Sequence, residues 1–189
     1  MKGENSITTQ NSAMKSKSIP IKKYIIKYGV FLGFSIVIYS LVNYAIGNYT
    51  TKSIFHYFIL LLITVISIIA GLISFKRKNN NFIDLMEAIK IGIGITVIGG
   101  LIVTFWEIIV LKIIDPEIIT QLEGNQIKKI AEKSKDFSQE NIDRKIAITQ
   151  KFTSPWIMLI TALIEDIIVG FFLSLLVGLV IRKKRDPFK

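Results

Sequence analysis

The stretch Trp156–Ile181, WIMLITALIEDIIVGFFLSLLVGLVI, carries only two charged side chains, on the adjacent residues Glu165 and Asp166. About 20 helical residues cross the ~30 Å hydrocarbon core of a bilayer, and this stretch is long enough to do so. Three more apolar blocks of comparable length precede it, near Tyr28–Ile46, Tyr57–Phe75 and Ile89–Ile114. A segment in lipid must satisfy its own backbone hydrogen bonds, and alternating strands of ~10 residues are absent from the sequence. The sequence therefore predicts an all-α membrane protein built as a four-helix transmembrane bundle.

The net charge of +10 over 189 residues follows a membrane topology rather than a nucleic-acid-binding pattern. Basic residues gather in three segments that four spans place on one side: the N-terminal segment, the connection Lys76–Lys78 and the tail Arg182–Lys189. The long connection 115–155 has nearly equal numbers of acids and bases. Positively charged connections stay in the cytoplasm, so we expect both termini inside and 115–155 outside. We expect a multi-pass protein of the inner (cytoplasmic) membrane, in contact with the lipid bilayer and with no nucleic-acid partner.

Composition divides the chain into a membrane domain and two tails. Residues 1–21 form a polar, basic tail that we expect to be disordered, residues 22–184 form the four-span domain, and residues 185–189 form a short cytoplasmic tail. Within the loop 115–155, apolar stripes from Ile119 to Phe137 and from Ile142 to Phe152 predict an outer amphipathic helical hairpin with a turn near Asp136. Its apolar faces are too small for a separate core. We expect it to rest on the bundle or the membrane surface, or to act as a binding lid.

Small residues recur at helical spacing in every predicted span. Helices in lipid associate by close packing rather than by hydrophobic burial, so small side chains mark the faces along which they meet. These candidate packing residues are Gly29 and Gly33 in the first span, Gly71 in the second, Gly92, Thr96 and Gly100 in the third, and Ala162, Gly170, Ser174 and Gly178 in the fourth. The four stripes predict a compact bundle.

Three carboxylates fall inside the predicted spans: Glu107, Glu165 and Asp166. Glu107 continues the small-residue face of the third span beyond Gly100, and Asp166 lies within that of the fourth, whereas Glu165 is turned ~100° toward a different neighbour. Counted from the outer helix ends at ~1.5 Å per residue, Glu107 is ~10 Å deep and Asp166 ~15 Å deep. If the third and fourth helices pack together, we expect Glu107 and Asp166 to approach each other in the outer half of the bundle.

The environment of these acids leaves three interpretations open. No lysine, arginine or histidine lies at that depth in the sequence, and an acid near the bilayer centre costs at least ~2.5–3.5 kcal/mol. The acids are therefore neutral groups hydrogen-bonded between helices, part of a proton or cation pathway, or hydrated by an outward-facing vestibule.

The sequence contains no recognisable enzymatic constellation. It has no cysteine, and its single histidine, His56, has no partner set for a metal site or a catalytic triad. The glycines between Gly92 and Gly100 lie within a span rather than between a strand and a helix, so they do not form a phosphate-binding loop. We expect no catalytic residues, no cofactor and no metal.

Short motifs at the edges of the apolar blocks resemble a known family. They are ISFKRK at 73–78, FIDLMEAIKIG at 82–92, DPE at 115–117 and IEDIIVGFFLSLLVGLVIRKK at 164–184. Together they resemble the bacterial membrane proteins grouped as domain of unknown function 4199, over roughly Lys22–Lys184. The resemblance implies an integral membrane protein with an outer helical loop, and it supplies no activity, cofactor or catalytic residue.

Two functional hypotheses follow from the sequence. The first is a non-enzymatic inner-membrane protein that acts as an accessory, scaffold or regulatory subunit, bound to a membrane-protein partner or to further copies of itself. The small-residue faces, the exposed loop and the missing catalytic set favour it. The alternative is a proton- or cation-coupled transport element that uses Glu107, Glu165 and Asp166, and that would have to dimerise because four spans are few for a transporter. Whether the three acids converge on a water-accessible cavity discriminates between the two.

Overall fold

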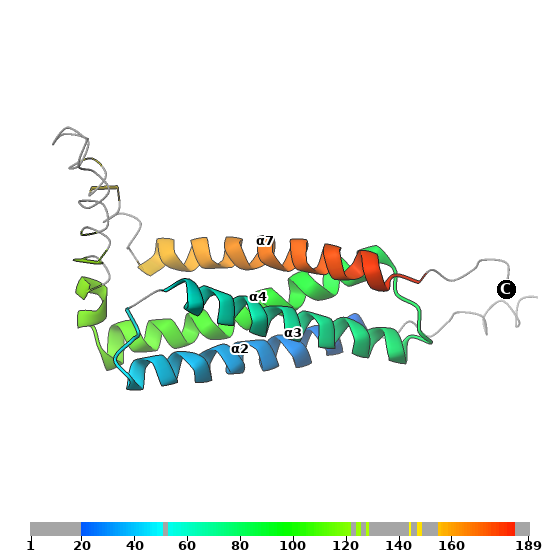
Figure 1. Ribbon diagram of the computed structural model, residues 1–189, viewed down its shortest axis with the longest axis horizontal. Coiled ribbons are helices and arrows are strands. Elements are labelled where there is room, and N and C mark those ends of the chain that lie inside the picture. Colours follow the sequence, from blue (N-terminus) through cyan, green and yellow to red (C-terminus); the bar gives the residue numbers. More distant parts are fainter. Residues whose placement is uncertain are drawn as a thin grey trace, which may run out of the picture.

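Four long helices lying side by side make up most of the described structure (Figure 1). A computed structural model describes residues 20–50, 53–121, 124–125, 128, 144, 147–148 and 155–183. The helices are α2 (Ile21–Ala45), α3 (Ile54–Lys78), α4 (Leu85–Ile109), which continues into the π-helix η1 (Val110–Ile114), and α7 (Pro155–Ile181). All four, with α4 and η1 taken together, are long and apolar enough to cross a bilayer. The predicted four-helix transmembrane bundle is confirmed, and the chain is a multi-pass membrane protein.

The helices begin earlier than the apolar blocks from which they were predicted. Helix α2 includes Lys22, Lys23 and Lys27 in its first turns, because lysine stems can lie along a helix while their ammonium groups reach water. Helix α4 begins at a capping box in which the Glu87 carboxylate accepts a hydrogen bond from the backbone N–H of Asp84 (2.9 Å). Hydropathy thus locates the membrane-embedded part of each helix, and capping residues locate its start.

Helix α4 is the central helix of the bundle, and its glycines face two different neighbours. It packs along α2 on one side and along α7 on the other. A methyl group added to Gly99 would lie 2.8 Å from the Leu32 side chain of α2, and one added to Gly33 of α2 would lie 2.7 Å from Cβ of Ile102. Only glycine permits such an approach, which brings the α2 and α4 backbones together as small-residue packing in lipid requires.

The α4–α7 interface pairs small residues with small residues. Gly92 lies directly against the Ser174 side chain, and Gly170 lies against the Thr96 hydroxyl. Ser174 and Thr96 are 0% and 1% exposed, and each hydroxyl donates to a carbonyl of its own helix, Phe171 and Ile93 respectively, at 3.1 Å. The interface is therefore close-packed and its hydroxyl groups are satisfied.

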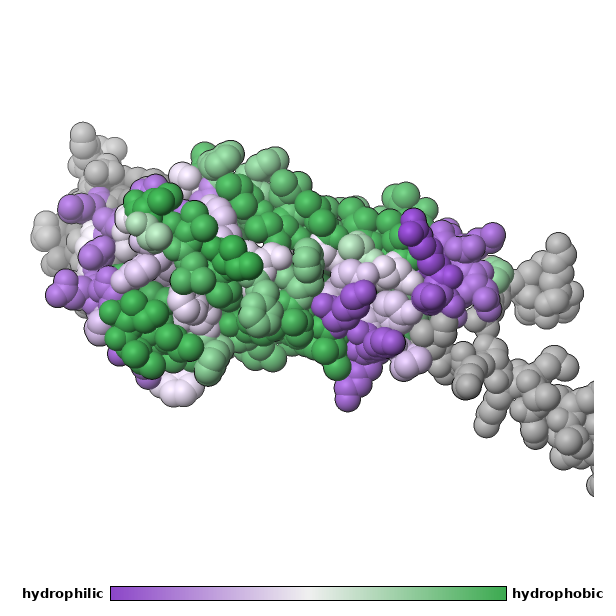
Figure 2. Space-filling view, turned by 90° about the horizontal axis from the view of Figure 1, so that it is seen from below, coloured by the Kyte–Doolittle hydropathy of each residue, from purple (hydrophilic) through white to green (hydrophobic). Residues whose placement is uncertain are grey.

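One end of the molecule holds the start of α2, the end of α3, the start of α4 and the end of α7 (Figure 1). We call it the basic end because lysines and arginines gather there, among them Lys76–Lys78 and Arg182. There the Lys76 ammonium donates to the carbonyl of Ile181 (2.8 Å), and Ile83 and Lys183 exchange two backbone hydrogen bonds (3.1 and 3.0 Å). Figure 2 shows an apolar belt between hydrophilic residues at the two ends. Hydrogen bonds thus join the end of α3 and the start of α4 to the end of α7 at the basic end, and the candidate acids lie in the opposite half.

Several sequence predictions fall on segments outside the described residues. These are residues 1–19 of the predicted basic tail, the tail 185–189 and most of the predicted hairpin in 115–155, including the turn near Asp136. Of that loop, residues 117–121 are helical.

Candidate functional site

Residues of all four helices enclose a cavity of about 430 Å³ in the half of the bundle opposite the basic end. We call it the acidic cavity because Glu107, Glu165 and Asp166 all line it. Apolar side chains make up most of its wall, among them Leu32, Ile36, Leu60, Leu61, Val103 and Val169. The three acids singled out in the sequence therefore share one space surrounded by apolar side chains.

Asp166 and Glu107 reach the acidic cavity from the facing helices α7 and α4. Both side chains are half-buried, and the Asp166 carboxylate lies directly against Gly100. Because Gly100 has no side chain, the space beside α4 accommodates the carboxyl group of Asp166. The close packing of α4 and α7 thus brings Glu107 and Asp166 to the same cavity, as the spacing of the small residues had led us to expect.

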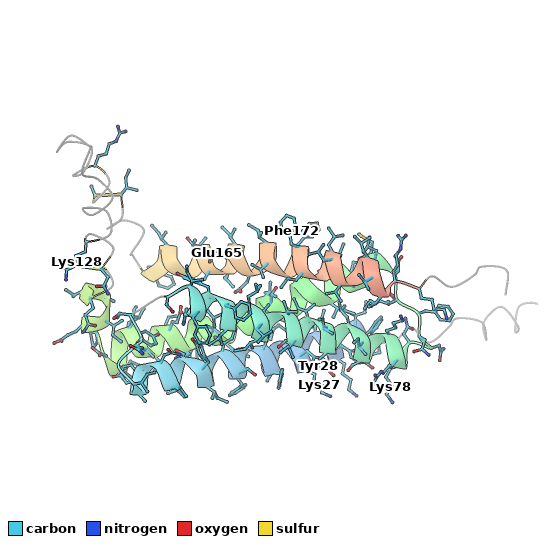
Figure 3. All side chains as sticks on the ribbon, viewed as in Figure 1. Lys27, Tyr28, Lys78, Lys128, Glu165 and Phe172 are labelled. Atoms are coloured by element: carbon cyan, nitrogen blue, oxygen red, sulfur yellow. The ribbon has the colours of Figure 1, made fainter. Side chains whose placement is uncertain are left out.

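Glu165 lines the same cavity as Asp166 but faces a different neighbouring helix. The ~100° turn between adjacent residues does move it away from α4, and its side chain is exposed. It turns toward α3, whose residues Tyr57 and Leu61 line the same cavity (Figure 3, Glu165). Since α3 forms the other wall, two consecutive acids on α7 reach one space from two sides.

A polar cluster of Ser40, Tyr49 and Trp106 lies beyond the acidic cavity and interacts electrostatically with Glu107, and the sequence patterns did not predict it. The Trp106 indole N–H donates to the Ser40 hydroxyl of α2 (3.0 Å). Burial and, to a smaller extent, the Glu107 carboxylate raise the pKa of Tyr49, in the connection after α2, to about 12, and a hydrogen bond with Ser40 opposes the shift. Tyr49 therefore remains protonated at neutral pH. No pattern in the sequence connects Tyr49 to α4.

The acidic cavity opens on the face between α3 and α7. Leu32 and Gly100, at its floor, are buried. The lining residues Tyr57 and Leu61 of α3 and Val169 of α7 are exposed, as is Glu165. At ~1.5 Å per residue, Val169 lies ~21 Å along α7 from its first residue, so the opening extends down the side of the bundle.

The composition of the lining restricts the chemistry of the acidic cavity. Among the described residues that line it there is no lysine, arginine or histidine. No three His, Cys, Asp or Glu side chains in the described part of the chain come close enough together to hold a metal ion. A carboxylate in apolar surroundings is costly unless a proton or a cation neutralises it. The described lining therefore presents three carboxyl groups in largely apolar surroundings.

Comparison with known proteins places the chain in one grouping. Residues 27–183 match the family described as "Protein of unknown function (DUF4199)". Neither a curated protein nor a solved structure matches the chain.

Proposed function

The chain belongs to the DUF4199 family, which is defined without an activity, so we propose its function from the acidic cavity: a proton- or cation-coupled transport element that uses Glu107, Glu165 and Asp166. One observation carries the proposal. Three acids from two helices line one cavity whose described lining holds no basic side chain. Ionisable residues at membrane depth are rare because they are costly, and they commonly mark ion or proton pathways.

The proposed cycle is an exchange at the three carboxyl groups. In the empty cavity protons neutralise the acids, and a cation that enters takes the place of a proton, because both compete for the same carboxylate oxygens. Tyr57 is the other titratable side chain that lines the cavity, and Tyr49 lies close to Glu107 beyond it. A transport cycle also needs access from the opposite side, which we assign to rearrangement of the helices within a homo-oligomer.

The charge distribution supports an orientation for this cycle. Lysines and arginines gather at the basic end, and positive residues are retained in the cytoplasm. We infer that both termini are cytoplasmic, that residues 115–155 are outside, and that the acidic cavity lies in the outer half of a bacterial inner membrane.

A flux measurement tests the proposal. The protein is reconstituted into vesicles that enclose a pH-sensitive dye, and the decay of an imposed pH gradient is followed with and without external cations. We expect decay above that of empty vesicles, and its loss in the double variant Glu107→Gln, Asp166→Asn. The matched control is Glu117→Gln, which removes an exposed acid that does not line the cavity. A wild-type protein indistinguishable from empty vesicles contradicts the proposal.

The outer side of α7 favours a second candidate function, that of an accessory or scaffold protein. Helix α7 packs mainly against α4, and apolar side chains along its length, among them Ile160, Ile164 and Phe172, are exposed. Figure 3 shows Phe172 pointing away from the other helices. We expect gentle detergent extraction to recover a partner membrane protein or a defined homo-oligomer. A monomer without partners contradicts this second function.

A further inference from the structure

The acidic cavity combines two features that a small hydrophilic cation does not require. Most of its wall is apolar, and its volume of about 430 Å³ is within the range of ~300–1,000 Å³ typical of sites for organic ligands. A proton or a bare metal ion needs no apolar wall of this extent. The three acids, moreover, do not come close enough together to hold a metal ion.

The position of the opening adds a second constraint. Its exposed edge is formed by α3 and α7, with Tyr57 and Leu61 on one side and Glu165 and Val169 on the other. Both helices cross the bilayer, so this edge faces the hydrocarbon region rather than only the water beyond the helix ends. A ligand that enters here must therefore partition into the membrane first.

The three acids and one aromatic ring favour a ligand with a positive charge. Glu107, Glu165 and Asp166 are negative when ionised, and no basic side chain is found among the described lining residues. The ring of Tyr57 at the edge adds a face that attracts cations. An ionised acid repels anionic ligands, and a neutral ligand leaves the acids protonated, as in the empty cavity, and forms no ion pair with them.

We propose that the acidic cavity binds a lipophilic organic cation, a single positive charge on an aromatic or alkyl body, which enters sideways from the membrane between α3 and α7. The apolar wall holds the body of the ligand, one carboxylate pairs with its charge, and protons neutralise the remaining acids. The inference names the substrate class of the proposed transport site, and it therefore rests on the function proposed above.

Binding of methyltriphenylphosphonium to the full chain in nanodiscs of zwitterionic lipid tests the inference. Equilibrium dialysis against empty nanodiscs separates binding from partition into lipid. Triphenylphosphine oxide has nearly the same shape without the charge, and tetramethylammonium has the charge without the aromatic body. We expect saturable binding of the phosphonium and affinities at least on the order of tenfold weaker for both controls, since each lacks one half of the complementarity. Equal binding of the uncharged oxide overturns the inference, because it reveals an apolar groove for lipid or a second chain.

Three variants locate the bound cation. Asp166→Asn removes a charge at nearly constant shape and should weaken binding on the order of tenfold. Ala162→Phe fills the cavity from α7 while every acid remains, and it should abolish binding. Glu117→Gln should bind like the wild type. Circular dichroism and gel filtration check that each variant is folded, and unchanged binding in both cavity variants overturns the inference.

The flux and binding measurements test the transport proposal and the ligand class independently of each other. Proton flux that depends on the acids, without phosphonium binding, leaves the transport proposal standing and overturns the organic cation as its substrate. Saturable binding that depends on Asp166, without any flux, supports the ligand class and contradicts transport.

Discussion

The substitution Gly33→Ala tests whether close backbone approach holds α2 and α4 together. The added methyl carbon would lie 2.7 Å from Cβ of Ile102 and 3.0 Å from the carbonyl oxygen of Gly99. Carbon atoms pack best at ~3.5–4.0 Å, so the two helices must separate locally by about 1 Å. Neither contacting atom can rotate away, since a Cβ and a carbonyl oxygen move only with the backbone. Relief therefore requires displacement of a whole turn of helix.

Two opposing effects determine how much stability the Gly33→Ala substitution removes. Overpacking of this kind costs ~1–3 kcal/mol, and the upper part of that range applies because the contacts are rigid. Replacing glycine by alanine within a helix returns up to about 1 kcal/mol. We expect a net loss of about 2 kcal/mol, which corresponds to a melting temperature lower by roughly 4–8 °C for a chain of this size.

Thermal unfolding in a mild detergent, followed by circular dichroism, measures this loss. The matched control is Gly124→Ala, because a methyl group at that helical glycine would meet no atom of the described residues within 4 Å. We expect the control to melt with the wild type or slightly above it. A Gly33→Ala protein as stable as the Gly124→Ala control would refute the assignment of this interface.

Two further predictions concern the two ends of the bundle. Lys76→Met keeps the length of the side chain but removes the hydrogen bond to the carbonyl of Ile181, so we expect a loss of about 1 kcal/mol in thermal unfolding. The exposed neighbour substitution Lys78→Met is the control, and equal effects of the two would argue against a specific cap on α7. Because burial raises the pKa of Tyr49 from 10.0 to about 12, the contribution of its neutral phenol to stability is complete below pH 10 and is lost as the pH rises toward 12. The difference between ultraviolet titrations of the wild type and Tyr49→Phe should show one phenol ionising near pH 12, and ionisation near pH 10 would contradict its burial beside Glu107.

The sequence was sufficient to predict the spans and one pair of packing faces. An apolar block of about 20 residues is long enough to cross the bilayer as a helix, so the number of such blocks predicts the number of spans. The small-residue spacing in α4 and in α7 indicated which sides of these two helices meet, and the residues concerned are Gly92, Thr96 and Gly100 in α4 and Asp166, Gly170 and Ser174 in α7. This worked because a stripe of small residues is a local property of one helix.

The surroundings of the acids could not be predicted in the same way. The neighbour that Glu165 faces depends on where α3 lies, and no periodicity within α7 contains that information. Tyr49 interacts electrostatically with Glu107, and it packs against the cluster that contains Val110 and Leu111, where α4 changes to the π-helix η1. Such π segments are rare, and helical spacing of apolar residues does not predict them.

Infrared spectroscopy of the protonated carboxyl band tests most directly whether the acidic cavity exchanges protons or holds dry interhelical acids. The band of Asp166 is isolated by subtracting the spectrum of Asp166→Asn from that of the wild type in lipid bilayers. The account predicts that this band shifts promptly on transfer to heavy water and that its intensity changes with the pH of the medium. A band that neither shifts in heavy water nor responds to pH would contradict the account, because it would show Asp166 to be a sealed hydrogen-bonding group between α4 and α7.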